Sequence, residues 1–117
     1  MSTHPNAMLL CVITPHDLAR KTMKAILEEY GGDDDHDTKI GGVDYHHRVM
    51  EGSYDESWQI SANEGDLVFF DLVTYGYGDV IEWNKLAGQQ RSLEEWAIKV
   101  CEKHKAEYKI YVGANYW

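Results

Sequence analysis

The hydrophobic residues of this chain are spaced in ways that predict a succession of strands and helices. The unbroken apolar run at 7–13 has the length of a buried strand. Residues 15–30 carry apolar positions at three- and four-residue spacing, which is typical of an amphipathic helix. Thr14 suits the N-cap of this helix and Pro15 its first position, and Gly31 with Gly32 ends the pattern.

Alternation of apolar and polar residues predicts strands in the middle of the chain. In the segment 43–50, Tyr45 and His47 fall on one face, and Asp44 and His46 fall on the other. A shorter alternation at 57–61 follows a turn-prone stretch at 51–53, so we expect these two segments to form a hairpin. The segment 66–74 is apolar on both faces, as in the central strand of a sheet.

The last third of the chain predicts a second amphipathic helix at 83–104 and a strand at 108–112. The order of elements is therefore β-α-β-β-β-α-β. This order predicts a single α+β domain over residues 1–117, a sandwich in which two helices lie on one face of a mostly antiparallel five-stranded sheet. Such a domain is a relative of the split β-α-β arrangement with one extra strand.

The composition, with 44% hydrophobic and 26% charged residues among 117, is that of a soluble globular protein with one core. The sequence contains no apolar run long enough to cross a membrane, and its first residues have neither a basic leader nor an apolar run sufficient for export. Cys11 and Cys101 lie far apart and form no CxxC motif. We therefore expect a reduced, cytoplasmic protein.

Charge is distributed unevenly along the chain, whose formal net charge is −9. Residues 49–84 contain eight acidic residues and no Lys or Arg, together with seven aromatic residues. Phosphate contacts need Lys and Arg, so this excess of acid argues against direct binding to nucleic acid or to an anionic membrane. A basic protein surface is the natural complement of such a chain.

Acidic side chains in predicted loops, with one tyrosine as an anchor, are the candidate partner-binding residues: Asp33, Asp34, Asp35, Asp55, Glu56, Tyr77, Asp79 and Glu82. Carboxylates fixed on a scaffold imitate a phosphate array. The sequence therefore predicts a small acidic binding or inhibitor protein that occupies a basic surface of a protein partner, including a surface that otherwise holds nucleic acid.

In its small size, acidity and lack of a catalytic motif, the chain resembles the proteins that phages and other mobile elements encode against host defence nucleases, anti-CRISPR inhibitors among them. The resemblance implies a nucleic-acid mimic that acts on a defence complex. A symmetric homodimer, which buries the sheet face not covered by helices together with Trp117, is a further hypothesis that is compatible with this one.

The enzymatic alternative is a small metal-assisted or carboxylate-dependent hydrolase that uses Asp44, His46 and Asp71. Asp44 and His46 share a strand face and suit an acid/base pair or part of an open metal site. Asp71 lies in an apolar strand, where burial would raise its pKa. The acidic run at 33–37 fails as a calcium loop because Thr38 stands where Gly is needed. The sequence thus predicts no resident metal and no cofactor.

Overall fold

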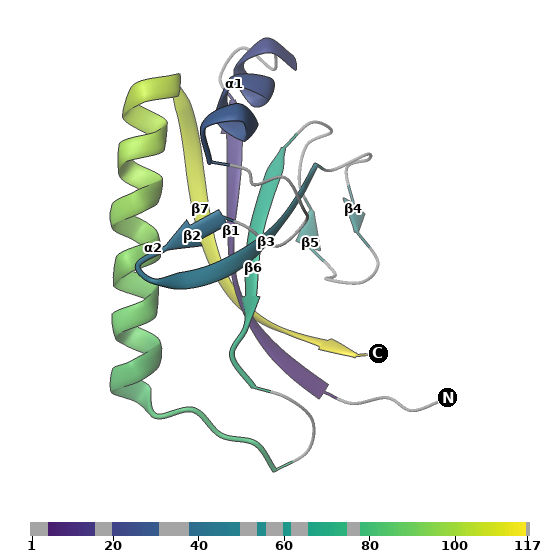
Figure 1. The fold of residues 1–117 in the computed structure, drawn as a ribbon. Helices are drawn as coiled ribbons and strands as arrows, with labels where there is room; N and C mark the ends of the chain where they lie inside the picture. Colours follow the sequence, from purple (N-terminus) through teal and green to yellow (C-terminus); the bar gives the residue numbers. More distant parts are fainter. Residues whose placement is uncertain are drawn as a thin grey trace.

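An antiparallel sheet and a long helix dominate the computed structural model, which describes residues 5–15, 20–30, 38–49, 54–55, 60–61, 66–74 and 78–116 (Figure 1). In chain order the elements are β1 (Pro5–Pro15), α1 (Arg20–Tyr30), β2 (Thr38–Ile40), β3 (Val43–Val49), β4 (Tyr54–Asp55), β5 (Ile60–Ser61), β6 (Leu67–Leu72), α2 (Trp83–His104) and β7 (Ala106–Tyr116). Neither described helix has a stretch long and apolar enough to cross a membrane.

The main sheet has five strands in the order β2-β3-β6-β1-β7, and each neighbouring pair is antiparallel. Two β-α-β units interleave in this order, because β6 lies between β1 and β3 while β1 lies between β6 and β7. This is the split β-α-β arrangement, with β2 added at one edge. The predicted α+β fold, with a five-stranded antiparallel sheet and two helices, is confirmed.

Both helices pack on the same face of the sheet. Ile26 of α1 and Leu93 of α2 belong to the same buried cluster as Leu9 and Phe69 of the strands. The Phe69 ring meets the Trp96 ring edge to face at a centroid distance of 4.8 Å. Among the described residues, the cluster on the opposite face draws on strands and not on helices. It consists of Met8, Leu10, Val12 and Val68, with Phe70 and Leu72 packed against it.

Helix α1 is joined to α2 through Glu29. Its carboxylate accepts a hydrogen bond from Lys103 Nζ at 2.5 Å and lies 2.9 Å from His104 Nε2. The bonds to Lys103 and His104 lower the pKa of Glu29 to about 2. Lys103 and His104 lie in the last turn of α2, where the positive charge of Lys103 also suits the negative end of the helix dipole.

The start of the first helix differs from its prediction. The structure describes α1 from Arg20, whereas Thr14 and Pro15 are the last residues of β1. They pair with Glu107 and Ala106 of β7. A local sequence pattern that suits a helix start is therefore overridden by long-range strand pairing.

The hairpin predicted between 43–50 and 57–61 is wrong. Strand β3 pairs with β2 over residues 43–45 and with β6 over residues 46–49. Residues 60–61 pair instead with residues 54–55, in a separate two-stranded sheet. Figure 1 shows this small sheet on the side of the main sheet away from α2. The fifth strand of the main sheet is accordingly β2, at a position where the sequence pattern predicts no strand.

The tight turn between β2 and β3 depends on two glycines. Gly41 and Gly42 have φ values of 59° and 81°, and a type I′ hairpin turn requires positive φ at both central positions. A Cβ added to Gly41 would lie 2.7 Å from the Cβ of Ser92 in α2, whereas a Cβ added to Gly42 would meet nothing within 4 Å. The turn therefore approaches α2 closely at Gly41.

We expect Gly41→Ala to lower the free energy of unfolding more than Gly42→Ala does. Both substitutions place a Cβ at positive φ, which costs about 1–2 kcal/mol, but only the first adds an overlap with Ser92. Chemical denaturation of the two variants measures the difference. In a Ser92→Gly background the excess cost at position 41 should disappear. If the excess persists there, the approach to Ser92 does not constrain the turn.

Candidate functional site

Two predicted partner-binding residues, Asp79 and Glu82, have side chains that the structure describes. Both are exposed and lie in the 78–83 segment, which leads into α2. Two large apolar side chains accompany them, because Val80 is 86% exposed and Trp83 is 74% exposed. Large apolar side chains that stand in solvent beside carboxylates have the makeup of a contact surface.

Local hydrogen bonds shape the 78–83 segment. Gly78 has a φ of 80°, a left-handed value that glycine adopts without strain. The Asp79 Oδ1 accepts a hydrogen bond from the Val80 N–H at 3.0 Å. Glu82 is the N-cap residue of α2, and its C=O accepts a hydrogen bond from the Lys85 N–H at 3.1 Å. The Glu82 side chain makes no capping hydrogen bond, so its carboxylate stays available to a partner.

The structure describes no side chain of the other predicted partner-binding residues. Asp33, Asp34, Asp35, Glu56 and Tyr77 lie outside the described residues. Asp55 belongs to β4, of which only the backbone is described. The structure thus brings together two of the predicted acidic residues, Asp79 and Glu82, and adds Val80 to them.

The three residues of the enzymatic alternative do not face one point. Asp71 lies on the helix-covered face of β6, where it accepts a hydrogen bond from α2. His46 lies on the opposite face, and its ring stacks on Phe70 at a centroid distance of 5.1 Å. Asp44 shares that face, is exposed, and lies 3.8 Å from Lys39 Nζ. Asp71 therefore lies on the opposite face of the sheet from Asp44 and His46, although the charges of both act across the sheet on the pKa of Asp71, with His46 lowering it and Asp44 raising it.

Asp71 takes part in a polar contact between the sheet and α2. The Gln89 amide Nε2 donates hydrogen bonds to Asp71 Oδ2 at 2.8 Å and to Tyr45 Oη at 3.1 Å. Tyr45 is fully buried, and desolvation raises its pKa to about 12. Burial also raises the pKa of the half-buried Asp71, although the bond from Gln89 acts in the opposite direction. One amide therefore satisfies two polar groups at the border of the core.

A hollow of about 230 Å³ adjoins this contact and is lined by Ile40, Gly41, Val43, Lys85, Gly88, Gln89 and Ser92. A carboxyl group with a raised pKa is a candidate for proton transfer. Neither Asp71 nor Tyr45 lines the hollow, however, and Tyr45 has no exposed surface. The contact is best explained as structural, because it fixes the position of α2 over the sheet.

The described part of the chain contains no candidate metal site. No group of three or more His, Cys, Asp or Glu side chains there is suited to hold a metal ion. The predicted acidic loop at 33–37 lies outside this part, so the structure does not describe its geometry.

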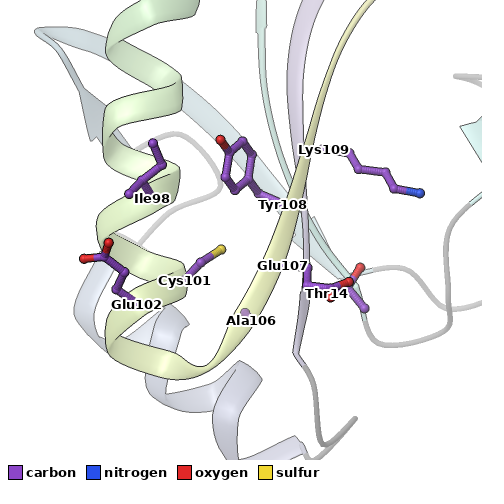
Figure 2. Close-up of a pocket in the computed structure, with 8 residues that line it drawn as sticks. All are labelled: Thr14, Ile98, Cys101, Glu102, Ala106, Glu107, Tyr108 and Lys109. Carbon is purple, nitrogen blue, oxygen red and sulfur yellow. The ribbon is translucent and has the colours of Figure 1, made fainter.

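A larger groove, of about 570 Å³, lies between the C-terminal half of α2 and β7 (Figure 2). Its lining residues are Thr14, Ile98, Cys101, Glu102, Ala106, Glu107, Tyr108 and Lys109. Burial raises the pKa of the Cys101 thiol to about 11, so at neutral pH this group is a poor nucleophile. The groove thus offers apolar surface rimmed by charges rather than a reactive centre.

Comparisons with protein-family models, with curated proteins and with solved structures give no match for this chain. The sequence pattern does not identify Val80 or Gln89 as candidate site residues. A signal exists for Gln89, which stands four and eight residues before Leu93 and Ala97 and so falls on the buried stripe of α2. Val80 could be recognised from the sequence because it is an apolar residue that directly follows the polar turn residues Gly78 and Asp79.

We expect Asp71→Asn to remove a pH dependence of stability. The folded state raises the pKa of Asp71 above its ordinary value of 3.8, so the folded chain holds this proton more tightly than the unfolded chain does. The free energy of unfolding of the parent protein therefore falls as pH rises from about 4 through the raised pKa, and stays lower above it. Urea unfolding of both proteins across this pH range measures the difference.

Glu28→Gln is the control, since it removes an exposed carboxylate from α1 that does not act on the pKa of Asp71. If Glu28→Gln changes the pH profile as much as Asp71→Asn does, or if Asp71→Asn leaves the profile unchanged, the assignment to Asp71 is wrong.

Proposed function

We propose that this chain is a small acidic binding protein that occupies a basic surface of a protein partner, of the kind that otherwise holds nucleic acid. The observation that supports the proposal is the 78–83 segment, in which exposed Val80 and Trp83 accompany the exposed carboxylates Asp79 and Glu82. The net charge of −9 extends the attraction to a basic partner beyond the contact itself.

The two kinds of side chain have separate roles in this proposal. Carboxylates accelerate the encounter with a Lys- and Arg-rich surface and fix its orientation, and ionic strength weakens this effect. An exposed tryptophan supplies short-range affinity, because large rings buried at the centre of an interface carry much of the binding energy. Asp79 and Glu82 therefore act mainly on the association rate, and Trp83 acts mainly on the dissociation rate.

The anti-CRISPR class of phage inhibitors is the model for this activity, since such proteins are small, acidic and lack catalytic motifs. The hydrolase alternative has less support than the binding function, because the sheet separates Asp71 from Asp44 and His46.

Capture at low ionic strength tests the proposal. We expect the immobilised chain to retain a basic protein from an extract of the cells that encode it, and to release that protein as salt is raised or as duplex DNA is added in excess. Asp79→Lys with Glu82→Lys should weaken the affinity for the captured protein at least about tenfold, mainly through the association rate. Trp83→Ala should weaken it by about 2 kcal/mol, mainly through the dissociation rate.

The matched control is Glu28→Lys with Glu95→Lys, which makes the same change in net charge at exposed positions of α1 and α2. Equal loss of binding in the control would show that general charge, and not the 78–83 segment, drives capture. Retention of no basic protein would contradict the proposed function.

A further inference from the structure

Strand β7 leaves a long edge of the main sheet open to pairing. It has eleven residues, and β1 is the one described strand that pairs with it. The other edge of the sheet is much shorter, because β2 has three residues. Short edges discourage further pairing, whereas long edges with unpaired backbone groups invite it.

The hydrogen bonds of β1 identify the groups at the open edge. Ala7 accepts a bond from the Val73 N–H at 2.9 Å, so its backbone groups point toward the β6 side. Backbone direction alternates along an antiparallel strand, so Met8, Leu10 and Val12 point toward β7, where their register partners are Gly113, Tyr111 and Lys109. The N–H and C=O groups of Tyr108 and Ile110 therefore point outward from the sheet.

The charges around Tyr108 are self-complementary under two-fold symmetry. If a second β7 pairs antiparallel about Tyr108, Glu107 lies opposite the partner's Lys109, and Lys109 lies opposite the partner's Glu107. A two-fold axis centred on Glu107 would place two glutamates opposite each other, and one centred on Lys109 would place two lysines opposite each other. Opposite charges directly across strands stabilise a pair and like charges destabilise it. Of these three registers, charge favours the one centred on Tyr108, in which residues 106–110 of the two β7 strands pair.

We propose that the open edge of β7 binds a second copy of this chain, forming a continuous sheet by antiparallel pairing centred on Tyr108. The groove beside β7 supports this occupant. Figure 2 shows Tyr108 projecting from β7 toward α2, while Lys109 projects to the other side. Opposite residues of an antiparallel pair share a face, so the two tyrosines meet between the two α2 helices. Each Ile98, 40% exposed at the groove, then faces the other copy.

A charge exchange tests the register. By analytical ultracentrifugation we expect a two-fold mass for the parent chain, and at least a roughly tenfold higher dissociation constant for Glu107→Lys and for Lys109→Glu, because each puts like charges across the two-fold twice. The double variant Glu107→Lys/Lys109→Glu restores opposite charges and should return to within about threefold of the parent. Lys85→Glu, an exposed reversal on α2 outside the groove, is the control and should have no effect.

Disulfide formation is a second, independent test of the proposed strand register. In a Cys101→Ala background, Glu107→Cys/Lys109→Cys should form a covalent dimer on mild oxidation, because the two positions are non-hydrogen-bonded neighbours across the two-fold. Each single cysteine variant should remain monomeric under denaturing conditions. A monomeric parent chain, a failure of the double charge variant to recover, or equal cross-linking of the single variants would overturn the proposal.

Discussion

Strand β1 is buried on both of its faces, and the rest of the structure depends on this constraint. Every residue from Met8 to Ile13 is at most 5% exposed. Leu9, Cys11 and Ile13 join the cluster beneath the helices, and the residues between them join the cluster on the opposite face. Backbone groups at this depth need partners, so β1 requires a strand at each edge. Strands β6 and β7 fill these two positions, and α1 and α2 cover one face.

The long open edge follows from the same requirement. Strand β7 pairs with β1 in one continuous register from Pro5 opposite Tyr116 to Pro15 opposite Ala106. Strand β7 is therefore as long as β1, although the sequence pattern predicts a strand only at 108–112. A chain that buries a long central strand beside an edge strand must expose an equally long row of backbone groups at that edge. The edge that β7 leaves without a described partner strand is thus a consequence of the core and not of local sequence.

The hydrophobic periodicity of the sequence predicts some helices and strands correctly but does not predict how the strands pair. The helix at 83–104 agrees with its prediction because its apolar stripe is continuous, and β6 is recognised as central because both of its faces are apolar. Alternation identifies a strand but not its neighbour, so the partners of β3 are missed. Asp71 stands out in the sequence because it interrupts an apolar strand. Its hydrogen-bond donor Gln89 belongs to α2, whose position depends on the whole fold, so the local pattern does not identify this pair. Thr74, which lies three residues after Asp71 in the sequence, instead accepts a bond from the Ala7 N–H.

Helix α2 separates the two surfaces for which binding is proposed. The 78–83 segment lies at its start and the groove begins at Ile98, about 22 Å further along at the rise of an α-helix. Binding at one surface therefore leaves the other free. In a dimer centred on Tyr108 the two α2 helices run in opposite directions, so the two 78–83 segments lie at opposite ends of the assembly. A partner with repeated basic surfaces can engage both, and the second contact is then intramolecular, which raises avidity without any new contact type. This geometry favours an extended partner over a compact one.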